Sequence, residues 1–106
     1  MVRVDTVTSV GASGNRYSFD VYFWGQPFRP LGGVYVVLRR QMNGGYDVLY
    51  IGQTGDLSER FDQHHKQQCF DRNQRTHIGV LLEYNEQRRL AIERDLLGAY
   101  RPTCKS

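Results

Sequence analysis

Two apolar segments lie on either side of a glycine-containing turn, and this pairing constrains the fold more than any other feature of the sequence. Residues 33–40 read GVYVVLRR, residues 47–53 read DVLYIGQ, and residues 43–45 between them read Asn-Gly-Gly. An Asn-Gly pair between two β-branched segments is typical of a β-hairpin. The first segment is apolar at odd and even positions alike, so we expect a strand that is covered on both faces.

A two-residue turn would set the register of this hairpin. Counting back from Asn43-Gly44 places Tyr35 opposite Gly52, and the same count places Tyr50 opposite Val37. Ladder partners share a face, so the two tyrosines become diagonal neighbours about 7–8 Å apart. The glycine leaves space for a ligand to approach the backbone. The alternative is ordinary core packing of two tyrosines, and a three-residue turn without a bulge would spoil the register.

Two further segments have strand patterns. Residues 17–24, YSFDVYFW, alternate apolar and other side chains, and residues 77–84, HIGVLLEY, form an apolar run. Residues 1–16 are polar with Gly-Ala-Ser-Gly in the middle, which predicts a loose arm or a short strand and turn. Asp56 with Glu59 forms a capping box, which predicts a helix from Asp56 to about Gln67.

A last helix is expected over residues 86–100, capped by Asn85. The order of elements predicts an α+β fold: a small antiparallel sheet of three core strands, an added N-terminal strand, and flanking helices. We divide the chain into an N-terminal arm with an added strand, residues 1–31, and a globular unit, residues 32–106.

The helix predicted at residues 56–67 has polar groups beside its apolar side. Its apolar centre consists of Leu57, Phe61 and His64, and Arg60 flanks it. A cation and an imidazole at the edge of a buried face need partners, which the hairpin tyrosines or an anionic ligand could supply. A surface-reaching arginine and a hydrogen-bonded core histidine are the alternative.

The last helix carries a carboxylate inside its apolar arc. The arc consists of Leu90, Ile92, Leu96, Leu97 and Tyr100, and Glu93 falls within it. Burial of an unpaired carboxylate costs several kcal/mol, so Glu93 needs a cation. That cation is either Arg89, four residues earlier, or a divalent metal.

Composition favours a phosphate-bearing partner. Of the 14 basic residues in this chain of net charge +3, 12 are arginine, whose planar fork matches phosphate oxygens two at a time. The candidate nucleic-acid contacts are Arg39, Arg40, Lys66, Arg72 and Arg75. Two cysteines are too few for a disulfide framework, and no apolar run suits a signal peptide or a membrane span. We therefore expect a cytoplasmic protein that does not contact membranes.

Together, the motifs Gly33-Val34-Tyr35 and Tyr50-Ile51-Gly52, with Arg60, His64 and Glu93 downstream, resemble the GIY-YIG nuclease superfamily. The match covers about residues 32–104 and is fairly specific, since it combines two motifs at the usual separation with an arginine and a helical glutamate. The resemblance implies a stand-alone catalytic domain with a three-stranded antiparallel sheet flanked by helices.

The resemblance also implies an activity, the metal-dependent hydrolysis of phosphodiester bonds in DNA by an endonuclease. Glu93 would hold one Mg²⁺ or Mn²⁺ ion, and Arg60 would stabilise the transition state. Tyr35 would be the general base or would position the water, assisted by Tyr50 and His64. Gly33 and Gly52 are the motif glycines.

Two features depart from the family pattern. Many members carry an asparagine soon after the proline that follows the last helix, where this chain has Cys104 and Lys105. Family nucleases also owe target choice to a second domain, so recognition would come from residues 1–31, a second subunit or a homodimer, or else cleavage is unspecific. The alternative function is a catalytically weak or inactive GIY-YIG module that binds nucleic acid or a protein partner.

Overall fold

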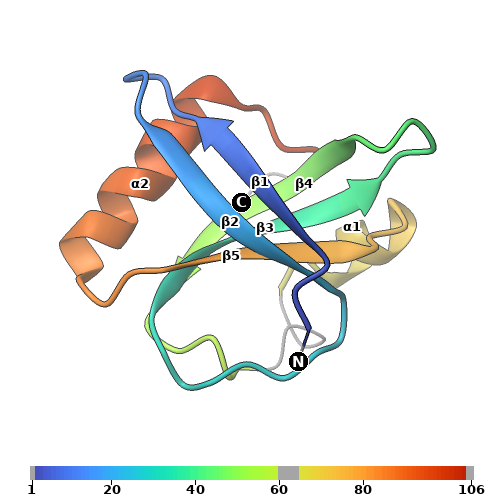
Figure 1. Cartoon of the computed structure of the whole chain (residues 1–106), viewed down its shortest axis with the longest axis horizontal. Helices are drawn as coiled ribbons and strands as arrows, with labels where there is room; N and C mark the ends of the chain where they lie inside the picture. The colour runs from blue at the N-terminus through green and yellow to red at the C-terminus, as the bar shows by residue number, and fades with distance from the viewer. Residues whose placement is uncertain (1, 60–64, 105–106) are drawn as a thin grey trace.

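The computed structural model describes residues 2–59 and 65–104. Five antiparallel strands form one curled sheet with a helix against each face, so the predicted α+β class is confirmed (Figure 1). The elements are β1 (Asp5–Val10), β2 (Arg16–Phe23), β3 (Gly33–Arg40), β4 (Tyr46–Thr54), α1 (Gln67–Arg72), β5 (His77–Leu82) and α2 (Glu86–Ala99). The strands lie in the order β1-β2-β5-β3-β4.

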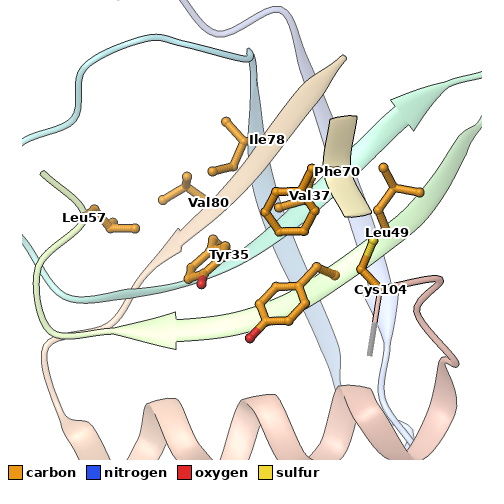
Figure 2. Packing of buried hydrophobic residues seen from close by; sticks show 9 residues of the cluster. Tyr35, Val37, Leu49, Leu57, Phe70, Ile78, Val80 and Cys104 are labelled. Atoms are coloured by element: carbon orange, nitrogen blue, oxygen red, sulfur yellow. The ribbon is translucent and has the colours of Figure 1, made fainter. Parts of the chain in front are cut away.

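Strand β3 is covered on both faces, as predicted. Its first six residues are buried and alternate between two apolar clusters. Tyr35 and Val37 pack on the side of α1, in an apolar cluster that includes Leu57 and Val80 (Figure 2). The even-numbered residues pack on the side of α2, against Leu96. A strand buried on both faces has no polar side, which explains the continuous apolar run.

The hairpin turn differs from the predicted one. The amide of Gln41 donates to the carbonyl oxygen of Gly45 at 2.8 Å, which encloses a loop of three residues and not two. Gly44 has φ +91° and its amide donates to the Gln41 carbonyl at 3.0 Å, the left-handed position that such a loop requires. The predicted two-residue turn is therefore wrong.

The predicted register is nevertheless confirmed at the tyrosines. Tyr35 lies opposite Gly52 and Tyr50 lies opposite Val37. The register shifts by one residue between Val37 and Leu38, where Leu49 of β4 is the extra residue of a β-bulge. The bulge offsets the longer turn and lets Leu49 and Tyr50, although consecutive, pack into one apolar cluster.

The segment before α1 does not follow the prediction. Asp56–Glu59 form a turn, in which the carboxylate of Asp56 accepts from the amide of Ser58 at 2.8 Å, and the amide of Leu57 donates to the carbonyl of Leu31 at 2.8 Å. Residues 57–59 are a turn and not the first turn of an α-helix, so the predicted start at Asp56 is wrong, while residues 60–64 of the predicted helix lie outside the described residues. Helix α1 begins at Gln67.

The N-terminal strands extend the sheet from the β5 side. β2 is an internal strand between β1 and β5, and β1 is the edge. Helix α2 contacts β3 and both edge strands, β1 and β4, because the sheet curls around it (Figure 1). Asn85 caps α2 as predicted, its side chain accepting from the amide of Arg88 at 3.0 Å.

The two cysteines, which we expected in a reducing compartment, form a disulfide. The bond joins Cys69 of α1 to Cys104, with a Cα–Cα distance of 5.9 Å. The amide of Cys104 also donates to the carbonyl of Leu49 at 2.6 Å, so the segment after α2 covers the outer edge of β4. Within residues 2–59 and 65–104, no helix is long and apolar enough to span a membrane.

Candidate functional site

Tyr35 and Tyr50 lie side by side over the bare backbone of Gly52. Their ring centroids are 6.1 Å apart, which confirms the predicted diagonal contact. A Cβ added to Gly52 would lie 2.7 Å from the Tyr35 hydroxyl oxygen and 2.8 Å from Cε2 of Tyr50. The two rings thus occupy the space that we expected to be open to a ligand. Gly52 is required because the rings cross the strand there.

Gly33, the other motif glycine, is required for packing. A Cβ at Gly33 would lie 2.8 Å from the backbone oxygen of Leu81 and 2.9 Å from Cδ1 of Leu57. The neighbouring strand β5 and the turn after β4 therefore approach β3 closely at its first residue. This contact sets the position of Tyr35 two residues later.

Both tyrosines are almost completely buried, with 5% and 6% of their surfaces exposed. Burial raises the pKa of Tyr35, and the neighbouring Tyr50, Glu93 and Glu59 raise it further. Burial and the charge of Glu93 raise the pKa of Tyr50 in the same direction. Both phenols are therefore neutral at pH 7, and the carboxylate of Glu93 on α2 acts electrostatically on both hydroxyls.

Glu93 is half-buried on the side of α2 that faces β4. Loss of hydration raises the pKa of its carboxyl group above the usual value. Among the residues that the structure describes, the carboxylate has no hydrogen-bond or ion-pair partner. The predicted need for a cation is thus not met within this part of the chain.

Arg89, the alternative partner for Glu93, is bonded elsewhere. Its Nε donates to Oε1 of Gln53 at 2.9 Å, and its Nη1 donates to the carbonyl oxygens of Glu83 at 3.1 Å and Tyr84 at 3.0 Å. With 7% of its surface exposed, Arg89 is a buried link between β4 and the β5–α2 connection. The sequence does not predict this role of Arg89. Its one sequence signal is that Arg89 lies one helical turn before Glu93 and therefore on the same side of α2.

The predicted apolar arc of α2 is partly wrong. Leu96 is buried and Ile92 is half-buried, but Leu90 and Leu97 are 37% and 40% exposed. Arg89, which we expected only as an alternative partner of Glu93, lies on the buried side. Its three hydrogen bonds satisfy the guanidinium there.

Arg60 and His64, two of the predicted catalytic residues, lie outside the described residues. A different histidine, His65, has its ring 6.0 Å from that of Tyr50 at an interplanar angle of 82°. Phe70 of α1 lies 5.7 Å from the same tyrosine ring. No sequence signal favours His65, since a position beside the site depends on the path of the chain before α1.

Most of the candidate nucleic-acid contacts are engaged within the chain. Arg39 is paired with Asp47 at 2.7 Å, Arg40 donates to the Tyr46 hydroxyl at 2.9 Å, and Arg75 pairs with Asp71 and covers the Trp24 ring. Lys66 lies at the start of α1, and Arg72 is exposed in its last turn. Both belong to the start and end of helix α1, whose Phe70 packs against Tyr50.

The donor set is compatible with one metal ion shared with a ligand. Within the described ranges, no group of three or more His, Cys, Asp or Glu side chains could hold a metal. Mg²⁺ bound with phosphate commonly uses only one or two carboxylates and takes its other ligands from water and substrate. The single carboxylate of Glu93, without a partner there, fits such an ion and does not fit a preformed cage.

Comparisons with protein-family models, with curated proteins and with solved structures find no match to this chain. The arrangement itself brings one carboxylate and two neutral phenols together at the β4 edge of the sheet.

Proposed function

We propose that this chain is a metal-dependent endonuclease of the GIY-YIG type that hydrolyses phosphodiester bonds in DNA. The observation that carries the proposal is the contact between the Tyr35 and Tyr50 rings, whose centroids are 6.1 Å apart, near the half-buried carboxylate of Glu93, which has no partner in the described chain. Phosphodiester hydrolysis needs a cation and hydrogen-bond donors at one phosphate, and these three side chains can supply the anchor and the donors.

In this proposal, Glu93 anchors one Mg²⁺ or Mn²⁺ ion. When bound, the ion supplies Lewis-acid stabilisation of charge on the phosphate and on the leaving 3′ oxygen. Tyr35 and Tyr50, neutral because burial raises their pKa, donate hydrogen bonds and orient the attacking water. A neutral phenol with a raised pKa is a poor acceptor of the water proton, so we assign Tyr35 the positioning role and not that of general base.

Arg60 and His64 keep their predicted roles as part of the proposal. Arg60 would neutralise the non-bridging phosphate oxygens, and His64 would assist proton transfer. His65 provides an imidazole beside Tyr50, so each histidine should be replaced separately. A larger loss of activity in His65→Ala than in His64→Ala would move the assisting role to His65.

The direct test is the nicking of supercoiled plasmid at low salt with Mg²⁺ or Mn²⁺. We expect Glu93→Gln and Tyr35→Phe each to lower the rate by about 10²-fold or more, the scale of losing one group that stabilises the transition state. Glu86→Gln is the matched control, since Glu86 lies in the exposed first turn of the same helix. Undiminished nicking by Glu93→Gln would refute the proposal.

One observation favours a second function, that of a weak or inactive module that binds nucleic acid or a protein partner. Near the position where related nucleases carry an asparagine, Cys104 is buried in a disulfide and has no amide to offer. Tight binding of DNA without cleavage, in either metal and with branched substrates included, would support this function.

DNA, a second subunit or homodimer for target recognition, and a cytoplasmic location remain parts of the proposal. The disulfide argues for an oxidising compartment, because such bonds are rare in the cytosol. Alkylation of the protein immediately on cell lysis decides between the two. Two modified thiols per chain would support the cytoplasm, and none would place the protein in an oxidising compartment.

A further inference from the structure

A hollow of about 300 Å³ lies beside the candidate site. Its walls include Tyr50 and Ile51 of β4, together with Leu97, Tyr100, Arg101 and Pro102 from the end of α2 and the segment after it. Tyr50 therefore belongs both to the candidate site and to this hollow. Any molecule that fills the hollow touches a group that we place at the phosphate.

The hollow continues the line of contacts between α2 and β4. Arg89 bonds to Gln53, the charge of Glu93 acts on Tyr50, and Leu97 lines the hollow. Arg89, Glu93 and Leu97 follow one another at intervals of four residues, so each lies about one helical turn, 5.4 Å, beyond the last. The hollow is thus the next position along the helix after the proposed phosphate position.

We propose that this hollow holds one unstacked nucleobase, from the nucleotide next to the phosphate that is cleaved. The proposal rests on the proposed function, because the phosphate position is taken from it. The volume is at the lower end of the range for small-molecule pockets, about 300–1,000 Å³, which suits a single base.

The wall chemistry suits a base better than a purely apolar ligand. Leu97 and Pro102 offer apolar surface, Tyr100 offers an aromatic ring, and Arg101 is an exposed cation. Unpaired bases are commonly held by stacking on aromatic rings or on the plane of an arginine. The arginine favours an anionic chain over a neutral or cationic one, and the aromatic ring beside it favours a nucleic acid among anionic chains, because bases stack on aromatic rings.

Part of the wall of the hollow is fixed by covalent and hydrogen bonds. Cys104 completes the wall and is fixed by the disulfide and by its hydrogen bond to Leu49. Pro102, which also lines the hollow, is buried. A preformed pocket for an unstacked base favours single-stranded or locally opened substrate, since a base in a continuous duplex must first leave its stack.

The test measures binding of a short fluorescent single-stranded DNA in EDTA, where metal-dependent cleavage cannot occur. We expect Leu97→Asp and Leu97→Ala to weaken binding, the former about tenfold, within the range that one stacked base supplies. Leu90→Asp is the matched control, because Leu90 is equally exposed on the same helix but lies outside the hollow. Equal weakening by Leu97→Asp and Leu90→Asp would overturn the proposal, as would no binding at low salt.

A second arm replaces each nucleotide of the same DNA in turn by an abasic one. One position should weaken wild-type binding as much as Leu97→Asp does, and the two changes together should weaken it no further. Full additivity at every position would overturn the proposal. If Glu93→Gln abolishes nicking but the Leu97 variants bind DNA like the wild type, only the base pocket is refuted. If the Leu97 variants bind DNA more weakly but the wild type cleaves no substrate, only the nuclease function is refuted.

Discussion

Two carboxylates on opposite sides of α2 lie in opposite environments. On the side of the β1–β2 turn, Asp95 accepts hydrogen bonds from the amide and hydroxyl of Ser13 at 2.8 and 2.6 Å and from the hydroxyl of Tyr17 at 2.7 Å. These bonds lower the pKa of Asp95. On the side of β4, Glu93 has no such partner among the described residues, and burial raises its pKa.

The difference separates a carboxylate that joins two parts of the fold from one that we propose binds a metal ion. Asp95 ties α2 to the β1–β2 turn and is fully supplied with donors. A desolvated carboxylate without donors lowers stability, and groups of this kind are concentrated at functional sites. The β4 side of α2 is held instead by Arg89 and, beyond the helix, by the disulfide.

Removal of the disulfide should have the largest effect on stability. The bond closes a loop with a sequence separation of 35, for which the chain-entropy relation gives about 3–4 kcal/mol. We expect the free energy of unfolding of the wild type, measured with a denaturant, to fall by that amount on addition of a reductant. The double variant Cys69→Ser, Cys104→Ser should be insensitive to the reductant. An unchanged wild-type midpoint would show that the β4 side does not depend on the covalent link.

Gly52→Ala should have the next largest effect. The new methyl group would meet the Tyr35 ring and hydroxyl at 2.7 Å, and we expect a loss of about 1–3 kcal/mol, typical of overpacking, together with loss of nicking activity. Gly55→Ala is the control, since the nearest atom there is a guanidinium nitrogen of Arg89 at 3.6 Å. Similar unfolding midpoints for the two variants would contradict the packing that places the tyrosines.

Neutralising the two carboxylates should change thermal stability in opposite senses. Asp95→Asn should lower the melting temperature at pH 7, because the amide is a weaker acceptor for Ser13 and Tyr17. Glu93→Gln should leave the melting temperature unchanged or raise it, since it removes a desolvated charge. Calorimetry on both, with Glu86→Gln as the exposed control, checks this. A clear fall in Glu93→Gln would make Glu93 a structural residue.

The dependence of stability on pH should show the smallest and most specific difference. The pKa of Asp95 is lowered in the folded protein. Its contribution to stability is therefore present above the ordinary pKa of 3.8 and is lost as the pH falls through the folded pKa. Because the folded pKa of Glu93 is raised, stability declines as the pH rises from the ordinary value of 4.5 through the folded pKa. The free energy of unfolding should be measured from pH 3 to 7. The loss of stability toward low pH should be weaker in Asp95→Asn, and the decline of stability above pH 4.5 should be weaker in Glu93→Gln. Identical pH profiles in both variants would contradict this assignment.

The strands could be predicted because their signals are local. The apolar residues of β3 specify a strand buried on both faces, and Asn85 specifies the start of α2 through its own side chain. The turn at residues 57–59, where a helix start was expected, is tied to a distant residue, since the amide of Leu57 bonds to the carbonyl of Leu31. The register at Tyr35 was predicted correctly, although the turn was not, because the bulge at Leu49 offset the error.

The sequence by itself determined the α+β class and the β3–β4 hairpin, since both depend on residue type and short spacing, whereas the pairing of Tyr35 with Gly52 also depended on the bulge at Leu49. Only the tertiary structure decided which charged groups are satisfied. Arg89 and Asp95 have partners that are distant in the chain, whereas Glu93, between them, has none in the described residues. Helical periodicity predicts which way a side chain points, but hydrogen-bond partners and desolvation depend on what the folded sheet brings against it.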